Sequence, residues 1–411
     1  MASVQAKETP MGTLEPKSDP LLAYRAGFPI VNRTNYLISN SLGAVPAEVG
    51  PSLQSYFEAW ATRGVRAWEE GWWTMAAETG DLVAPLIGAH AGEVVFQPNV
   101  TLAHAVVFSA IDFGRKRDTI VTDAMHFPSI LYLIGQQRRL GAKVTMVPSD
   151  NGITVDTERI IEAIDEKTAF VNLSHVLFKS AYIHDIAAIA EKARKMEAIT
   201  IIDGYQAVGT IPLDVRASGI DVYIGGCLKW LCGGPGNAFV WVRPDLRCQL
   251  EPKLTGWMTH ERPFAFEPEL ARRDDVWRLL HGTPNIPGMH AARCGLEIIN
   301  EIGIEAIRSK SLRQTSRLLE LAAEAGYRCT TPRDPARRGG TVAIDIENGY
   351  EISKCLKSRD ILCDHRPGAG IRLSPHFYNR DDELDLAVAA IGEIQVSGAW
   401  RDFASATSAV T

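Results

Sequence analysis

Cysteines are few and follow no recognisable pattern: seven are scattered over 411 residues, and no two form a CxxC pair. The odd number and wide spacing argue against a disulfide framework and against a zinc site, and we expect no bound metal. Unpaired cysteines favour a reducing compartment, so we expect a cytoplasmic protein.

Long apolar runs are also absent. No stretch approaches the length of a membrane span, so we expect no association with a membrane. The first twenty residues are polar and contain prolines, without the apolar segment of a secretory signal. This composition predicts a disordered N-terminus over residues 1–20.

Charge of one sign is not concentrated anywhere. The 43 basic and 49 acidic residues give a formal net charge of −6, without a basic stripe or an arginine-rich run. We therefore expect no nucleic-acid partner. Neither a Walker-type phosphate loop nor a GxGxxG motif follows a strand-like run, so the sequence gives little support to an ATPase or a NAD enzyme.

The chain does contain a series of short apolar runs, most of them followed by a helical stretch. Most runs are β-branched and nearly continuous, which is typical of strands buried on both faces of a parallel sheet. Seven such runs occur, at 94–96, 119–122, 144–147, 169–173, 199–202, 222–224 and 239–242. They predict an α/β fold with a mostly parallel seven-stranded sheet covered by helices.

Asp203 and Lys229 occupy two places where such a sheet carries its ligands. Asp203 closes one apolar run, and ligands of parallel sheets sit at the carboxyl ends of the strands. Lys229 lies between two glycine pairs and has Leu228 and Trp230 as neighbours, which argues against a plain surface lysine. The pair suits pyridoxal phosphate, whose aldehyde forms an imine with a lysine and whose pyridine nitrogen is held protonated by a carboxylate. A buried acid with a snorkelling lysine is the alternative.

The pattern changes after about residue 283. Two long helical stretches, 287–300 and 304–325, lead to weaker strands at 341–344 and 361–363, which predicts a second, smaller α+β domain. A chain of this length is expected to form two lobes. We expect residues 21–50 to be the N-terminal segment of the small domain, 51–285 the large cofactor-binding domain and 286–411 the C-terminal small domain.

Three other stretches offer polar groups to a ligand. Asn99-Val100-Thr101 precedes an apolar helical pattern, where free N–H groups could cradle a phosphate or simply be capped. Arg372, in a strand-like Ile-Arg-Leu, could clamp a carboxylate with its planar guanidinium or be structural. Asn40 and Ser41 could face a substrate or serve only a turn.

The order and spacing of these stretches resemble the class V aminotransferase group of fold-type I pyridoxal phosphate enzymes, and within it the kynureninases. The similarity runs from about Tyr36 to Ile394. The motifs that carry it are Asn40-Ser41-Leu42-Gly43, His126-Phe127-Pro128, Ser174-His175-Val176, the run KSAYIHDI from Lys179, Lys229 with LCGGPGNAFVWV, Gly256-Trp257, Gly282-Thr283 and the segment around Arg372.

The resemblance implies a role for each matching residue. Lys229 would carry the imine and Asp203 would pair with the pyridine nitrogen. The residues implied to contact the cofactor are Val100, Thr101, Phe127, Ser174, Asp203, Gln206, Lys229, Trp257 and Thr283, with Phe127 stacking on the ring and Trp257 and Thr283 completing the phosphate site. Asn40, Ser41 and Arg372 would bind the substrate, with Arg372 holding the amino-acid carboxylate.

Four positions depart from the kynureninase pattern. Leu228 replaces a tyrosine before the lysine, and Gln206 replaces a histidine, so this position cannot titrate near neutrality. Ile130 replaces an acid, and Leu177-Phe178 replaces Asn-Tyr. We therefore expect a more apolar pocket than that of kynureninases.

The resemblance implies a homodimer, with the active site at the interface, that acts on a small α-amino acid. Lys229 would remove the α-proton, and from the resulting quinonoid the side chain would leave by kynureninase-like Cβ–Cγ hydrolysis or by β-elimination. A class V aminotransferase or an epimerase is the alternative, and a cofactor-fold protein used only for binding is a third hypothesis. A cysteine desulfurase would need an exposed loop cysteine, whereas Cys363 lies in an apolar, strand-like run.

Overall fold

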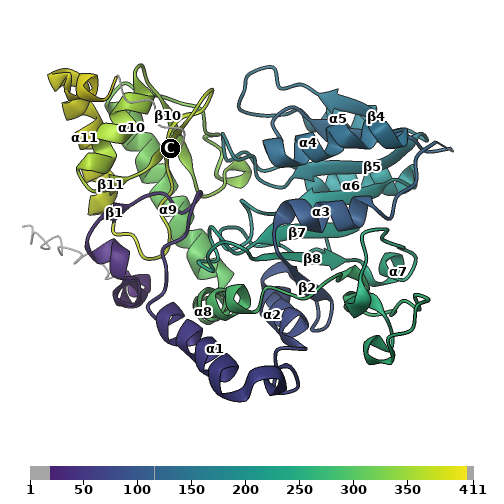
Figure 1. The fold of residues 1–411 in the computed structure, drawn as a ribbon. Helices are drawn as coiled ribbons and strands as arrows, with labels where there is room; N and C mark the ends of the chain where they lie inside the picture. The colour runs from purple at the N-terminus through teal and green to yellow at the C-terminus, as the bar shows by residue number, and fades with distance from the viewer. Residues whose placement is uncertain (1–18, 115, 405–411) are drawn as a thin grey trace, which may run out of the picture.

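The larger of two sheets has seven strands in the order β2-β8-β7-β6-β5-β3-β4, and residues 19–114 and 116–404 are described in this computed structural model (Figure 1). β8 runs antiparallel to both of its neighbours, and the other neighbouring pairs are parallel. The strands are β2 (Val94–Gln97), β3 (Thr119–Asp123), β4 (Lys143–Val147), β5 (Thr168–Ser174), β6 (Ile199–Asp203), β7 (Val222–Gly226) and β8 (Ala238–Val242). The predicted seven-stranded, mostly parallel sheet is confirmed, and each predicted run lies within one strand.

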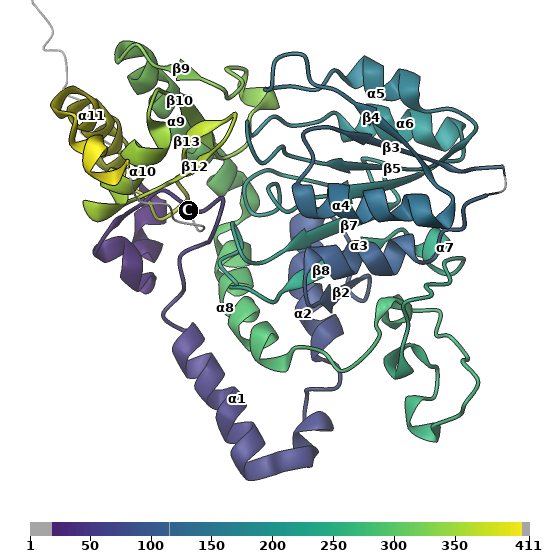
Figure 2. The same ribbon diagram turned by 45° about the horizontal axis from the view of Figure 1, so that its top comes forward.

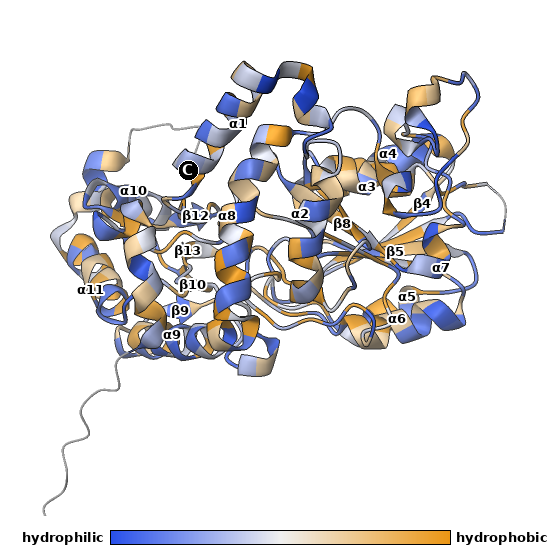
Figure 3. Cartoon of the chain, turned by 90° about the horizontal axis from the view of Figure 1, so that it is seen from below, coloured by the Kyte–Doolittle hydropathy of each residue, from blue (hydrophilic) through white to orange (hydrophobic). Residues whose placement is uncertain are grey.

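Helices cover both faces of this sheet. Figure 3 shows α3 (Val100–Phe108) and α4 (Pro128–Gln137) on one side and α5 (Thr157–Ala163) and α6 (Ile186–Lys195) on the other. Every residue of β5, β7 and β8 is buried, because each of these strands has helices or loops above and below it. The continuous apolar runs of the sequence are explained by this two-sided burial.

Beyond the β2 edge, α2 (Met75–Val83) packs on β2 and on α8 (Ile286–Ile302), and α8 packs on α1 (Val49–Arg63). α1 projects from the body of the molecule in Figure 2. The short helix α7 (Pro244–Arg247) follows β8, and 3₁₀ helices, among them η1 (Pro20–Gly27), η6 (Trp257–Thr259) and η8 (Val276–Leu279), join other elements.

The smaller lobe contains an antiparallel sheet in the order β12-β13-β10-β9. Its strands are β12 (Asp364–Arg366), β13 (Gly370–Leu373), β10 (Val342–Asp345) and β9 (Arg328–Cys329), and its helices are α9 (Ile304–Glu324), α10 (Gly349–Ser358) and α11 (Asp382–Ser397). β1 (Asn35–Tyr36) pairs in parallel with β11 (Ile361–Leu362), which brings the N-terminal segment to this lobe. This is the predicted α+β arrangement.

Two large apolar cores underlie the lobes. The first collects the buried side chains of the seven-stranded sheet together with α2 and α8, and the second lies among α9, α10, α11 and the small sheet. Because α8 contributes to the first core, the division of the chain near residue 285 stays a prediction, as does the division near residue 50.

The predicted disorder of residues 1–20 falls on residues 1–18, which lie outside the described residues. Of the other two, Asp19 accepts a hydrogen bond from the N–H of Leu21 and forms an ion pair with Lys310 at 2.9 Å. Within residues 19–114 and 116–404, every helix is too short or too polar to traverse a lipid bilayer.

Candidate active site

Lys229 lies in the turn that follows β7, where two chain segments pack closely. The N–H of Gly43 donates to the carbonyl oxygen of Leu228 at 2.9 Å. A Cβ on Gly43 would lie 2.0 Å from the carbonyl oxygen of Lys229, so only glycine fits there. The N-terminal segment therefore forms one wall of the lysine site.

The Lys229 side chain is buried, with only 7% of its surface exposed. Its Nζ lies 4.2 Å from the centroid of the Tyr205 ring and 5.6 Å from that of Phe127. Burial lowers the pKa of Lys229 to about 7; the Asp203 charge opposes this shift and the Arg372 charge adds to it. A large fraction of the amine is therefore neutral and nucleophilic near neutral pH.

Asp203 ends β6, beside Ser174 at the end of β5 in the parallel register. Its Oδ1 accepts a hydrogen bond from the N–H of Tyr205 at 2.9 Å. No donor among the described residues satisfies Oδ2, although the residue is 95% buried. One carboxylate oxygen is therefore held by the backbone and the other is available to a ligand.

Two more predicted residues lie at a strand end and at a helix start beside this sheet. Ser174 ends β5, and its Oγ is 3.3 Å from Nδ1 of His126. Phe127 precedes α4; its ring is 40% exposed and meets the Phe178 ring edge-on at 5.2 Å. Because the carboxyl ends of parallel strands meet at one edge, these groups border the same region as Asp203.

The segment that predicted a phosphate cradle forms the start of α3. Asn99 caps this helix, its side-chain oxygen accepting the N–H of Leu102 at 2.9 Å. The N–H groups of Val100 and Thr101 belong to the first turn, where a helix presents free donors and a partial positive charge. The cap occupies only one donor, so it leaves the N–H groups of Val100 and Thr101 able to bind an anion.

A hydrogen bond connects Gln206 with Asn40. Nε2 of Gln206 donates to the carbonyl oxygen of Asn40 at 2.9 Å, and Oε1 of Gln206 accepts from Nε1 of Trp230 at 3.0 Å. Asn40 is 1% exposed, and within the described chain neither its Oδ1 nor its Nδ2 has a hydrogen-bond partner. Ser41, half-buried, follows in the same turn. A buried amide without partners is costly unless a ligand or water satisfies it.

Arg372 is the buried cation of the site, with 2% of its surface exposed. Its Nε and Nη2 donate to the two carboxylate oxygens of Asp364 at 2.7 and 2.5 Å, and its Nη1 donates to the carbonyl oxygen of Phe178 at 2.5 Å. The charges of Arg372 and Asp364 both act on the pKa of Lys229, in opposite directions. The structure thus brings Arg372 into the electrostatic neighbourhood of the lysine.

Trp257 and Thr283 are the two predicted residues that the structure does not bring into contact with Lys229 or Asp203. Trp257 is 39% exposed and belongs to an aromatic cluster, meeting Trp73 edge-on at 5.2 Å. Thr283 is exposed. In the described chain, neither has a hydrogen bond or ring contact with Lys229 or Asp203.

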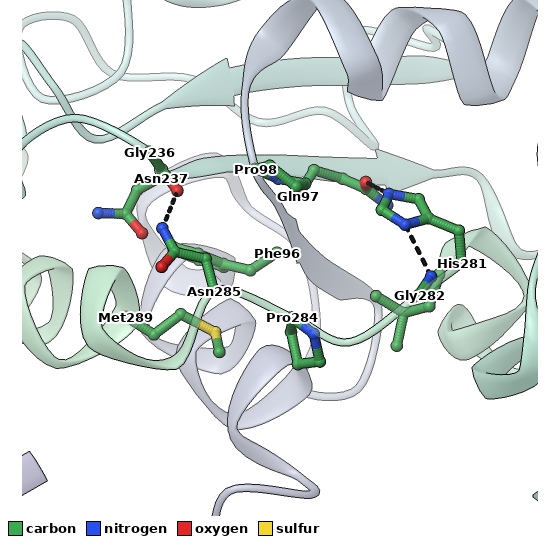
Figure 4. Close-up of a pocket in the computed structure, with 11 residues that line it drawn as sticks. Phe96, Gln97, Pro98, Gly236, Asn237, His281, Gly282, Pro284, Asn285 and Met289 are labelled. Carbon is green, nitrogen blue, oxygen red and sulfur yellow. Dashed lines mark hydrogen bonds between the residues drawn. The ribbon is translucent and has the colours of Figure 1, made fainter.

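A pocket next to Thr283 opens below the start of α3 (Figure 4). It is lined by Phe96, Gln97, Pro98, Gly236, Asn237, Leu280, His281, Gly282, Pro284, Asn285 and Met289. Figure 4 shows two of its ties: Nδ2 of Asn285 donates to the carbonyl oxygen of Gly236 at 3.0 Å, and Nε2 of His281 is 2.9 Å from Oε1 of Gln97. The Thr283 loop is thereby anchored to the glycine-rich segment after Lys229.

Three side chains near the site were not predicted. His104 and His126 are 0% and 1% exposed, and burial lowers the pKa of His104 to about 4, so its ring stays neutral. No sequence signal marks His104, and His126 was quoted only as part of the motif His126-Phe127-Pro128, without a role of its own. Asp364 could have been found, because the turn residues Pro367-Gly368 between two strand-like runs predict a hairpin that sets it opposite Arg372.

The four departures from the kynureninase pattern have different surroundings. Ile130 and Leu177 are each 1% exposed and belong to the apolar core, and Leu228 is half-buried beside Lys229. Phe178 packs on Phe127. The apolar character expected from the sequence is thus present around the lysine, on the side of Phe127 and Phe178.

A family model described as aminotransferase class-V matches residues 35–385 of the chain. The chain belongs to the class V aminotransferase family. Among curated proteins it is 33% identical to the kynureninase of Pseudomonas fluorescens, over 93% of this chain and 94% of that enzyme. It is 31% identical to the kynureninase of Burkholderia pseudomallei (strain 1106a), over 94% of this chain and 95% of that enzyme.

Solved structures of two other proteins share the fold. The apo cysteine desulfurase of Thermococcus onnurineus NA1 matches with a TM-score of 0.80 and 22% identity, over 94% of this chain and 100% of that chain. A lysine variant of C-DES, with glycine covalently linked to its PLP cofactor, matches with a TM-score of 0.82 and 18% identity, over 90% of this chain and 99% of that chain. At these identities the likeness concerns the fold.

This class V enzyme depends on pyridoxal phosphate, and its residues fit that group. Lys229 supplies an amine whose pKa is lowered to about 7 and which has no ion pair among the described residues. Among the described residues, Oδ2 of Asp203 and the side-chain amide of Asn40 have no hydrogen-bond partner. Phe127 is partly exposed, and α3 presents N–H groups at its start.

Proposed function

We propose that this enzyme cleaves the side chain of an α-amino acid in the manner of kynureninases, by Cβ–Cγ hydrolysis or by β-elimination. The observation that carries the proposal is the arrangement of Lys229 with buried Arg372 and Asp203. This arrangement supplies a base, a carboxylate clamp and an anion for a heterocycle within one region. The similarity to kynureninases over nearly the whole chain supports the same reaction class.

Bound pyridoxal phosphate supplies an electron sink for the bonds around the substrate Cα. In the proposal, Nζ of Lys229 would hold the cofactor aldehyde, and the same amine, when free, would accept the α-proton of the substrate. A pKa near 7 suits both tasks, because the amine is neutral often enough to attack and basic enough to accept a proton. The Tyr205 and Phe127 rings exclude water from Nζ.

In this proposal Asp203 acts on the cofactor and Arg372 acts on the substrate. Oδ2 of Asp203 would hold the proton on the pyridine nitrogen, while its Oδ1 accepts a hydrogen bond from the N–H of Tyr205. Arg372 binds the α-carboxylate of the substrate and fixes the orientation of the α-proton. The Asn40 amide and the Ser41 hydroxyl border the substrate.

The substrate side chain meets apolar groups. Leu228 and Phe178 stand where kynureninases carry tyrosines, and Ile130 stands where they carry an acid. We therefore propose that the preferred side chain is less polar than that of 3-hydroxykynurenine. Persulfide chemistry is disfavoured, because Cys363 is fully buried and burial raises the pKa of its thiol to about 12.

The experiment is a product assay of the cofactor-loaded enzyme with kynurenine, 3-hydroxykynurenine and a panel of other amino acids. Release of alanine together with an acidic co-product establishes Cβ–Cγ hydrolysis, and pyruvate with ammonia establishes β-elimination. Conversion of the cofactor to its amine form, with a 2-oxo acid as product, would establish transamination and overturn the proposal. Racemisation of the substrate without cleavage would establish epimerisation and overturn it as well.

We also propose a homodimer with the active site at the interface. α1 and the turn after it carry Phe57, Trp60 and Val65, which are 58%, 61% and 81% exposed. Such a run of exposed apolar side chains is typical of a protein interface. Trp257 and Thr283 would then join a phosphate site across the interface. A reducing, cytoplasmic location is proposed because all seven cysteines are free.

A further inference from the structure

A hairpin in the small lobe sets a carboxylate opposite the proposed substrate clamp. β12 and β13 pair in antiparallel register, with Asp364 directly across from Arg372. The turn between them contains Gly368, whose φ of 74° favours glycine, and β13 begins at Gly370, whose φ is 99°. The register places both side chains on the same face of the hairpin.

The contact between the two side chains is bidentate and fully buried. Nε and Nη2 of Arg372 donate to Oδ1 and Oδ2 of Asp364 at 2.7 and 2.5 Å, and the residues are 2% and 0% exposed. A bidentate pair fixes the plane of a guanidinium as well as its position. Asp364 therefore determines which edge of Arg372 faces the site.

The N–H groups of Arg372 that do not contact Asp364 are the two on Nη1 and one on Nη2. Nη1 donates to the carbonyl oxygen of Phe178, which ties the hairpin to the loop after β5. These three bonds leave one N–H on Nη1 and one on Nη2 without a partner in the described chain. A carboxylate accepts from two such N–H groups in a bidentate contact when both lie on one edge of the guanidinium.

A second guanidinium shares the same carboxylate. Nη2 of Arg366 lies 3.2 Å from Oδ2 of Asp364, and its side chain is 26% exposed. Burial alone would raise the pKa of Asp364, but its hydrogen bonds with Arg372 and the charge of both arginines hold that pKa below its ordinary value. Two guanidiniums against one carboxylate leave one positive charge for an anionic ligand.

We propose that Asp364 is the positioning residue for α-carboxylate recognition: it aligns the free edge of Arg372 with the substrate, and Arg366 is its second ion-pair partner. The inference rests on the proposed function, since it assigns the anionic ligand as the α-carboxylate of an amino acid. If Asp364 only stabilised the hairpin, its loss would affect ligands with and without a carboxylate equally. The two roles differ in how the site treats a ligand that lacks the carboxylate.

The experiment compares two ligands of the cofactor-loaded enzyme, l-alanine and ethylamine, which share the amine but differ in the carboxylate. Dissociation constants are read from the change in the cofactor's visible absorbance. In Asp364→Asn the affinity for l-alanine should fall on the order of 10²-fold, since a displaced guanidinium loses its aligned contact. The affinity for ethylamine should change less than about threefold. Arg372→Lys should show the same selective loss.

Two further variants keep the test decisive. Asp364→Glu retains the charge but moves it, so it should show the same selective loss to a smaller degree, and it serves if Asp364→Asn does not fold. Asp345→Asn removes a half-exposed carboxylate from the neighbouring strand β10 and should leave both affinities unchanged. Melting temperature and the amount of bound cofactor establish that each variant is folded.

The outcomes separate the inference from the proposed function. Selective loss of l-alanine affinity in the folded Asp364 variants supports the inference. Equal losses for both ligands, or no loss for either, overturn it while the proposed function stands. Failure of the wild-type protein to take up pyridoxal phosphate, or to bind l-alanine at all, overturns the proposed function and the inference with it.

Discussion

Gly43 and Lys229 touch through their backbones: a Cβ on Gly43 would lie 2.0 Å from the carbonyl oxygen of Lys229 and 3.0 Å from the Cα of Cys232. Neither atom belongs to a flexible side-chain end, so an added methyl group must displace the lysine turn or the N-terminal segment. The position of the proposed reactive amine is therefore coupled to a segment that lies nearly two hundred residues earlier in the chain.

The first prediction concerns this contact. Gly43→Ala should destabilise the protein by about 1–3 kcal/mol, the usual effect of overpacking, and reduce the cofactor bound per chain. Chemical denaturation and the cofactor's visible absorbance measure the two effects. Gly50→Ala is the matched control, because a Cβ there meets nothing within 4 Å. Normal loading of Gly43→Ala would show that the turn tolerates displacement.

The second prediction concerns the pH dependence of Lys229. Its pKa is about 7 in the folded chain against 10.5 ordinarily, so the unfolded state binds more protons between these values. The apoprotein's free energy of unfolding should therefore gain a rising contribution from this group between about pH 7 and pH 10.5. Urea denaturation of wild type and Lys229→Met at several pH values measures it. Parallel pH profiles of the two proteins would contradict the low pKa.

The third prediction separates binding from turnover at Asp203. Asp203→Asn keeps the shape but removes the charge that would hold the pyridine nitrogen protonated. We expect kcat to fall on the order of 10²-fold or more, while the cofactor still binds through Lys229. Steady-state kinetics on the substrate found by the product assay, with cofactor content measured in parallel, test this. A kcat close to that of wild type would remove Asp203 from the mechanism.

The fourth prediction concerns the cysteines. Cys363 is fully buried with a raised thiol pKa of about 12, whereas Cys248 is exposed. Iodoacetamide under native conditions should label Cys248 and leave Cys363 unmodified, as mapped by mass spectrometry. Labelling of Cys363 at a rate comparable to that of Cys248 would support the hypothesis of a cysteine desulfurase.

Much of the fold could be predicted because parallel strands carry a strong local signal. The seven apolar runs are continuous because both faces of the sheet are covered, and each of them became a strand. Asp203 and Lys229 could be paired from sequence alone, since both follow such runs and the carboxyl ends of parallel strands meet. The edge strand β4 is less buried than its neighbours, with only Val147 fully buried.

The partners of the site residues were harder to predict. Two facts depend on how distant segments pack: the Asn40 amide has no hydrogen-bond partner among the described residues, and Gln206 bonds to Trp230. His126 was part of a quoted motif, yet its contact with Ser174 depends on how two strands end. Local sequence patterns carry no information on such pairings.

The fifth prediction concerns the proposed dimer. Phe57 and Trp60 lie on α1 and are more than half exposed in the single chain. Burial of each aromatic ring in an interface would contribute about 1.5–3 kcal/mol, so a glutamate at either position should weaken association strongly. The double variant Phe57→Glu with Trp60→Glu should sediment as a monomer where the wild type sediments as a dimer.

Val396→Glu, on α11 and 90% exposed, is the control and should leave the dimer intact. Because Trp257 and Thr283 of one subunit would complete the phosphate site of the other, the monomeric variant should also bind pyridoxal phosphate more weakly. Dimerisation of the double variant with wild-type affinity would show that α1 lies outside the interface.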